Sequence, residues 1–160
     1  MALTPIPHER CSSMTQTKEQ ILQVAKDFDD VIETQDIERI LPFFAKDCSI
    51  ELFGITLHGH EGARKWLDWM FHHLTEISFE PISIMVDDNV FFEEFIVQGK
   101  LQDGRTVQSK QAELLVYENL LVKSLRLYFD RLDFAEAVSS SWINRKIIHK
   151  IIKESTKGLE

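Results

Sequence analysis

The chain has 160 residues, of which 44% are hydrophobic and 28% are charged, and its formal net charge is −8. This length and balance fit one globular domain rather than a disordered chain, and the negative charge argues against a nucleic-acid partner. No apolar run approaches the roughly 20 residues that a membrane-spanning helix needs, so we expect a cytoplasmic protein with no transmembrane segment.

The N-terminal segment, residues 1–14, is predicted to be a disordered leader. Pro5 and Pro7 interrupt it where a signal peptide would need an apolar stretch. Met14 is therefore an alternative start to Met1, and the segment is left out of the fold prediction.

Two helices are predicted after this leader. Thr17 and Gln20 match the capping-box pattern of a helix start. Asp36 can cap a second segment, which Pro42 should shorten or bend. The first helix has apolar residues at three- and four-residue spacing: Ile21, Val24, Ala25, Phe28, Val31 and Ile32.

A strand at Asp47 to Phe53 and a third helix follow. The turn between them has the sequence His58-Gly59-His60-Glu61-Gly62. The helix is the clearest element of the chain, because its apolar stripe is unbroken: Ala63, Trp66, Leu67, Met70, Phe71 and Leu74.

From Ile77 onward the periodicity becomes that of strands, and the turn signals predict an antiparallel meander. Asp103-Gly104 is the strongest of these hairpin signals. The runs Val90 to Val97 and Leu120 to Phe129 are apolar on both faces, whereas a sheet with one wet face should alternate. We therefore expect both faces to be covered, one of them by the tail or by a second subunit in a homodimer.

The tail, residues 139–160, is predicted to form a basic amphipathic helix. It carries a charge of +3, which leaves −11 for the rest of the chain. This difference favours docking of the tail on its own acidic domain, and a membrane surface or another protein are the alternatives.

The order of these elements resembles the nuclear transport factor 2-like superfamily, particularly its SnoaL-like branch. Three segments carry the resemblance: residues 36–47, residues 58–63, and Leu127-Tyr128-Phe129-Asp130-Arg131-Leu132-Asp133-Phe134. It implies an α+β fold, a cone-shaped barrel whose curved antiparallel sheet wraps around the N-terminal helices. The SnoaL-like domain would span residues 15–138, followed by the C-terminal helix.

The same resemblance implies a ligand cavity and dimers through the sheet. Members include ketosteroid isomerases, polyketide cyclases, epoxide hydrolases and noncatalytic binding domains. This sequence departs from the isomerase pattern, because Phe28 and Leu52 stand where those enzymes have a Tyr and a catalytic Asp. The epoxide-hydrolase triad is replaced by Glu94, Ile96 and Leu127.

Three residues are candidates for acid/base chemistry. Glu113 lies in an apolar strand, where burial would raise its pKa, although it could instead face solvent. Asp130 could act as a base or could cap the next helix. His58 has an unperturbed pKa near neutrality, with a surface role as the alternative.

Six apolar residues are predicted to line a pocket for a small hydrophobic ligand, or to be plain core: Phe28, Leu52, Phe53, Trp66, Trp69 and Phe95. No metal site is predicted, since His58 and His60 lack further ligands and the two cysteines lack a zinc spacing. No cofactor is predicted either, because the sequence contains no nucleotide-binding loop.

These features predict a SnoaL-like protein that binds a small hydrophobic molecule. It would be an isomerase, cyclase or hydrolase if it is an enzyme. The alternative is a noncatalytic dimeric module for protein interaction. A pocket with at least two converging titratable groups would favour the enzyme.

Overall fold

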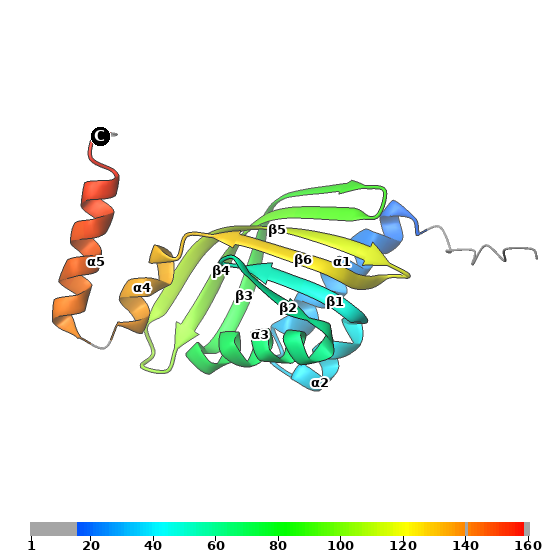
Figure 1. Cartoon of the computed structure of the whole chain (residues 1–160), viewed down its shortest axis with the longest axis horizontal. Helices are drawn as coiled ribbons and strands as arrows, with labels where there is room; N and C mark the ends of the chain where they lie inside the picture. The colour runs from blue at the N-terminus through cyan, green and yellow to red at the C-terminus, as the bar shows by residue number, and fades with distance from the viewer. Residues whose placement is uncertain (1–15, 140, 159–160) are drawn as a thin grey trace, which may run out of the picture.

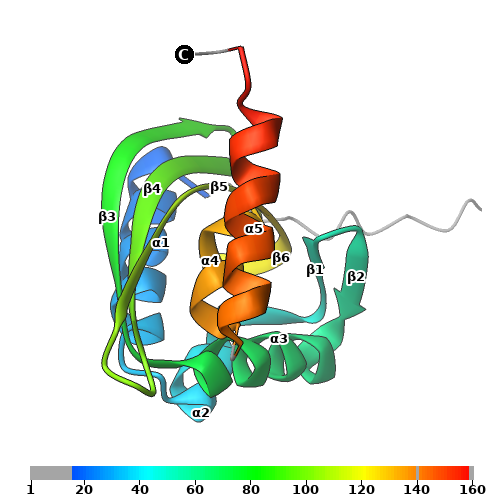
Figure 2. The same ribbon diagram turned by 90° about the vertical axis from the view of Figure 1, so that its left-hand side faces the viewer.

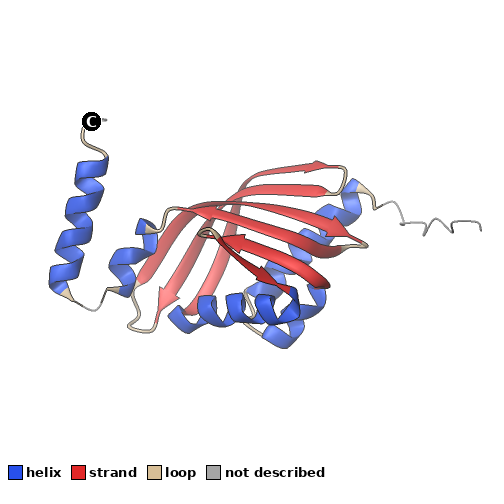
Figure 3. Ribbon diagram, viewed as in Figure 1, coloured by secondary structure: helices blue, strands red, loops and turns tan. Residues whose placement is uncertain are grey.

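The computed structural model describes residues 16–139 and 141–158, so the predicted leader at 1–14 lies outside the described residues. Six strands form one curved sheet that does not close, in the order β2-β1-β6-β5-β4-β3 (Figure 1). Helix α1 lies inside the curve of β3, β4 and β5 (Figure 2). The α+β cone predicted from the sequence is confirmed, with helices at one side of the sheet (Figure 3).

The first two helices begin where the sequence predicts. At the start of α1 (Lys18–Ile32), the Thr17 hydroxyl accepts from the Gln20 N–H at 3.2 Å, and the Gln20 side chain accepts from the Thr17 N–H at 2.8 Å. The Asp36 carboxylate accepts from the Glu38 N–H before α2 (Ile37–Ile40). Pro42 limits α2 to one turn, which continues as a short 3₁₀ helix, η1 (Leu41–Phe43).

Strands β1 (Phe44–Leu52) and β2 (Ile55–His58) form a hairpin that leads into α3 (Gly59–His73). Two glycines make that connection possible. Gly59 has φ +63°, a left-handed conformation that side chains disfavour. A Cβ on Gly62 would lie 2.9 Å from the Leu57 carbonyl carbon, so only glycine lets α3 pack this close to β2.

The rest of the sheet is formed by β3 (Leu74–Asp87), β4 (Val90–Leu101), β5 (Thr106–Glu118) and β6 (Leu121–Phe129). These strands form the predicted antiparallel meander. One pair differs from the antiparallel prediction, because β1 joins β6 in parallel. A parallel pair needs a long crossover, and β2, α3 and the meander together supply it.

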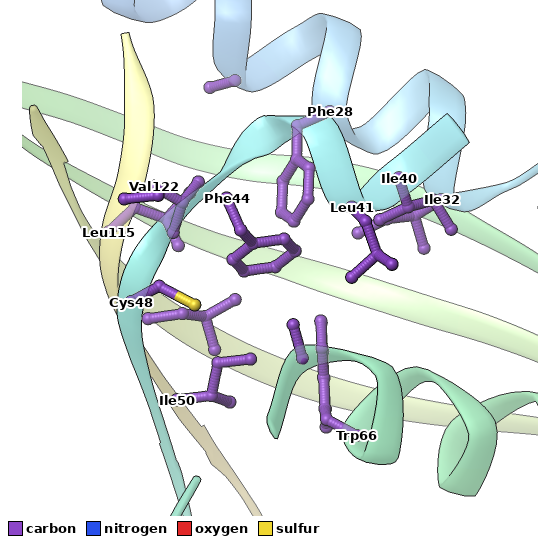
Figure 4. Close-up of a cluster of buried hydrophobic side chains, with 14 of the residues drawn as sticks. Phe28, Ile32, Ile40, Leu41, Phe44, Cys48, Ile50, Trp66, Leu115 and Val122 are labelled. Atoms are coloured by element: carbon purple, nitrogen blue, oxygen red, sulfur yellow. The ribbon is translucent and has the colours of Figure 1, made fainter. Parts of the chain in front are cut away.

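The main core fills the space between α1, α3 and the sheet (Figure 4). Phe28 is 1% exposed, and its ring centroid lies 5.3 Å from that of Phe44 in an edge-on contact. Phe44 in turn lies 6.3 Å from Trp66 of α3. Leu52 is buried in the same cluster. These contacts fix α1 over the concave face of the sheet.

Two helices follow the sheet, α4 (Leu132–Val138) and α5 (Trp142–Ser155). The predicted C-terminal helix is present, but the expected docking on the acidic domain is not. Helix α5 packs against α4, has no buried residue and points away from the sheet (Figure 1). Its apolar stripe, which includes Trp142, Ile143, Ile147 and Ile151, is exposed. None of the described helices is long and apolar enough to cross a bilayer.

Candidate active site

A cavity of about 400 Å³ lies between α1, α3, α4 and the concave face of the sheet. Its lining includes Leu74, Ile77 and Phe95, which belong to a second, smaller hydrophobic cluster. Most of its wall is aromatic or aliphatic. Its large side chains include Phe53, Trp66, Trp69, Met70, Phe79 and Phe95.

Three carboxyl groups meet at one side of this cavity, and we call them the acidic cluster: Asp29 of α1, Glu93 of β4 and Glu113 of β5. One carboxylate oxygen of each lies within 4.8 Å of the others. Glu93 and Glu113 are directly opposite each other in the β4–β5 ladder, and Asp29 approaches from the helix above. Asp29 and Glu113 line the cavity. The spacing could also hold a cation.

Burial keeps the carboxyl groups of the acidic cluster protonated at pH values well above the usual pKa range of a carboxyl group. Glu93 is 2% exposed, and loss of hydration raises its pKa to about 7. Burial together with the nearby charge of Glu93 raises the pKa of Asp29 to about 8. Burial and the charges of Asp29 and Glu93 raise the pKa of Glu113 well above its ordinary value. The cluster therefore holds both acidic and basic groups near neutral pH.

Two buried polar atoms near the acidic cluster have no hydrogen-bond partner among the described residues. They are Oε1 of Glu93 and the hydroxyl of Tyr117, whose side chain is 1% exposed. Burial and the charge of Glu113 raise the pKa of Tyr117, so the phenol stays protonated. Unpaired buried groups of this kind are uncommon and mark sites that a ligand or water completes.

The mouth of the cavity is built around Phe53, which has φ +56° in the two-residue turn between β1 and β2. A bulky residue in this conformation is strained, and such strain concentrates at functional sites. Arg131 holds it in place, because its guanidinium lies 4.6 Å from the ring centroid and donates to the Phe53 carbonyl at 2.8 Å. Phe129 packs on the same ring at 4.6 Å.

Helix α4 closes the adjacent side of the cavity with Phe134 and Ala135. The Ser109 hydroxyl donates to the Asp133 carboxylate at 2.6 Å, which ties the start of α4 to β5. The Phe134 ring lies 5.7 Å from Phe129. Helix α4 thus connects the cavity wall to the sheet.

The structure places one of the three predicted acid/base residues in the cavity. Glu113 is 7% exposed and belongs to the acidic cluster, so it does not face solvent. Asp130 is exposed, and its carboxylate accepts from the Leu132 N–H at 2.8 Å at the start of α4. His58 is exposed at the end of β2. The Asp130 carboxylate therefore binds the first N–H of α4 from the position before the N-cap residue, which is Arg131, and neither Asp130 nor His58 lines the cavity.

Four of the six predicted pocket residues line the cavity: Phe53, Trp66, Trp69 and Phe95. Phe28 and Leu52 do not line the cavity and belong to the main core, in which Phe28 points toward Phe44 (Figure 4). Both residues are therefore part of the core, which was the alternative to a place in the pocket.

Asp29 and Glu93 were not among the site residues predicted from the sequence, although the burial pattern around each gives a local signal. Asp29 lies four residues after Ala25 and three before Ile32, which places it on the buried side of α1. Glu93 alternates with the buried Phe91 and Phe95 on one face of β4. Both faces of β4 carry apolar residues, so alternation alone could not show which of Glu93 and Glu94 is buried.

A family model for the SnoaL-like domain matches residues 25–122, which is more than half of the chain. The chain belongs to the SnoaL-like family. No curated protein matches the sequence of this SnoaL-like domain.

Solved structures share the fold of this SnoaL-like domain at low sequence identity. A candidate polyketide cyclase from Xanthomonas campestris pv. campestris is 15% identical, with a TM-score of 0.69 over 76% of this chain and 98% of its own. A nuclear transport factor 2-like protein of unknown function from Burkholderia pseudomallei K96243 is 16% identical, with a TM-score of 0.68 over 76% and 98%. SalBIII, an epoxide hydrolase/cyclase-like enzyme of pyran ring formation in the polyether salinomycin, is 12% identical, with a TM-score of 0.65 over 72% and 95%. At these identities the neighbours show the fold alone.

Proposed function

We propose that this SnoaL-like protein is a cofactor-independent enzyme that binds a small hydrophobic substrate and moves protons on it, as an isomerase, cyclase or hydrolase. One observation carries the proposal, the acidic cluster at the side of an apolar cavity. Groups with pKa values displaced toward neutrality in such a place are typical of catalytic sites. The cyclase and epoxide hydrolase/cyclase-like neighbours are consistent with this reaction class.

Asp29 and Glu113 have complementary roles in this proposal. Asp29, with a pKa of about 8, becomes the general base as its proton is lost, and it contacts substrate from α1. Glu113 keeps its proton and acts as the general acid from β5. Glu93 is a positioning residue, because its charge and proton set the protonation of the other two.

The cavity wall supports the choice of a hydrophobic substrate. Phe95, Trp66 and Phe79 exclude water from the acidic cluster, which strengthens electrostatic interactions there. The strained Phe53 and the exposed Trp69 define the entrance. An apolar molecule with one ionisable C–H or O–H bond fits this combination of walls and acid groups.

The test is proton abstraction from nitrobenzisoxazole, an apolar probe that needs only a base. A carboxylate removes the ring C–H proton, the N–O bond breaks, and a coloured cyanophenolate forms. We expect turnover that rises with pH through about 8, the pKa of Asp29. Asp29→Asn should lower the rate by about 100-fold.

Asp130→Asn and His58→Gln are matched controls, because both residues are exposed and lie outside the cavity lining. They should leave the rate unchanged. A wild-type rate no greater than that of acetate at equal concentration would reject the proposal. So would equal rates for the wild type and Asp29→Asn.

One feature favours the second candidate function, a noncatalytic interaction module. The apolar stripe of α5 is exposed, with Trp142 at 66% and Ile147 at 52%. The acidic cluster favours the enzyme, because it supplies the converging titratable groups that a filled interaction domain would lack. A chain that ends at residue 141 should keep full nitrobenzisoxazole turnover if catalysis is its function.

A homodimer through the sheet is also part of the proposal. The strand register places Met85, Phe92 and Leu114 side by side on the outer face, opposite the cavity. Met85 is 58% exposed and Tyr128 on the same face is 54% exposed. Light scattering should show a dimer that Phe92→Lys converts to a monomer, whereas a monomeric wild type would reject this arrangement.

A cytoplasmic location remains part of the proposal. The buried Cys48 is a free thiol, as expected in a reducing compartment. Fractionation of cells that produce the full chain would test it.

A further inference from the structure

In the part of the chain that the structure describes, no basic side chain forms an ion pair with the acidic cluster. Among the described residues that line the cavity, the basic ones are His73 and Arg131. Arg131 is held at the mouth by Phe53, and the His73 ring packs against Trp69. Neither is ion-paired with the acidic cluster.

The groups around the acidic cluster add negative charge rather than positive charge. On α1, Asp30 and Glu33 add negative charge that acts on Asp29, and Lys26, whose charge opposes it, is ion-paired with Asp30 on the exposed side. On β5, Tyr117 adds a neutral hydroxyl. The cluster therefore faces no fixed positive group from the helix or from either strand.

A second observation points to a ligand. Oε1 of Glu93 is buried and has no hydrogen-bond donor among the described residues. Glu93 is 2% exposed, and its carboxylate is directed to within 4.8 Å of the carboxylate oxygens of Asp29 and Glu113. A buried acceptor without a donor is costly. A positively charged group within the cluster would remove that cost.

The cavity wall decides which kind of cation fits. Ca²⁺ takes six or more oxygen ligands, and Mg²⁺ usually keeps several waters. The wall beside the cluster supplies aromatic rings instead, among them Trp66, Phe79 and Phe95. Aromatic faces attract organic ammonium groups, whose methyl or methylene groups also need an apolar surface.

We infer that the cavity selects a hydrophobic organic cation, a molecule with a protonated or quaternary amine that lies against the acidic cluster and an apolar body that lies among the aromatic rings. The inference rests on the proposed function and names its substrate class. A bound cation favours the ionised form of the cluster, so near neutral pH its binding releases protons and generates the carboxylate base beside the substrate.

The test compares benzyltrimethylammonium with neopentylbenzene, which has the same shape and no charge. Titration calorimetry and the fluorescence of Trp66 and Trp69 report binding. Because the probe has a permanent charge, any pH dependence comes from the protein. We expect the cation to bind at least about tenfold more tightly than the neutral probe at about pH 8.5, and the preference to disappear near pH 5.5.

Proton release gives an independent readout. At about pH 7, the heat of cation binding should depend on the ionisation enthalpy of the buffer, and that of neopentylbenzene should not. Glu113→Gln and Asp29→Asn should each reduce the preference for the cation, and circular dichroism checks that both variants fold. Glu94→Gln is the matched control, since Glu94 pairs with Lys110 away from the cavity.

Equal affinity for the two probes at about pH 8.5 would overturn the inference. If neopentylbenzene then still inhibited nitrobenzisoxazole turnover, the proposed acid/base function would stand without an amine substrate. Absence of both binding and turnover would reject both. Calcium that displaces the cation, and that Glu113→Gln no longer binds, would assign the acidic cluster to a metal ion and also overturn the inference.

Discussion

Replacing Glu93 with glutamine should stabilise the protein at alkaline pH and have little effect in mild acid. The folded state holds the Glu93 proton up to about pH 7, whereas the unfolded state releases it near 4.5. Between these values the folded state binds more protons, so the free energy of unfolding falls as pH rises and levels off above about 7. The rise in the Glu93 pKa from 4.5 to about 7 on folding corresponds to a loss of about 3 kcal/mol in the free energy of unfolding. Glutamine resembles the protonated carboxyl and removes this loss.

Urea unfolding followed by tryptophan fluorescence measures this effect at about pH 5 and about pH 8.5. Between these two pH values, the free energy of unfolding of the wild type should fall by about 3 kcal/mol more than that of Glu93→Gln. Glu94→Gln is the control, because Glu94 is half-buried and ion-paired with Lys110 on the face of β4 opposite to Glu93. Parallel pH dependence of the wild type and Glu93→Gln would show that burial does not hold this carboxyl neutral.

Three further changes test the fold and the cavity. Phe28→Ala should lower the free energy of unfolding by about 3–5 kcal/mol in urea titrations, since its ring is buried against Phe44, and a loss below about 1 kcal/mol would contradict that packing. Trp69→Ala should cost much less stability, because this residue is 46% exposed, yet it should weaken neopentylbenzene binding measured by calorimetry. Thr17→Ala should cost about 1 kcal/mol through loss of the capping box, which Thr17→Ser should largely restore.

The sequence was sufficient to predict most of the local structure, because the residue patterns that predict it lie within one helix or one turn. The capping box at Thr17 and the apolar stripe of α3 each depend on residues a few positions apart. Hairpin signals such as Asp103-Gly104 predicted the meander in the same way. From this order of elements the SnoaL-like family could be named before any three-dimensional arrangement was known.

The acidic cluster depended on contacts between distant segments. Glu93 and Glu113 meet because of the register between β4 and β5, and Asp29 joins them because packing of Phe28 on Phe44 fixes α1 above the sheet. Strand alternation could not choose the buried face, since both faces of β4 are apolar. Burial and mutual repulsion, which raise the pKa values of these carboxyls, arise only when the three segments pack together. The sequence by itself therefore determined the elements and the family, and the tertiary structure alone decided which side chains form the candidate site.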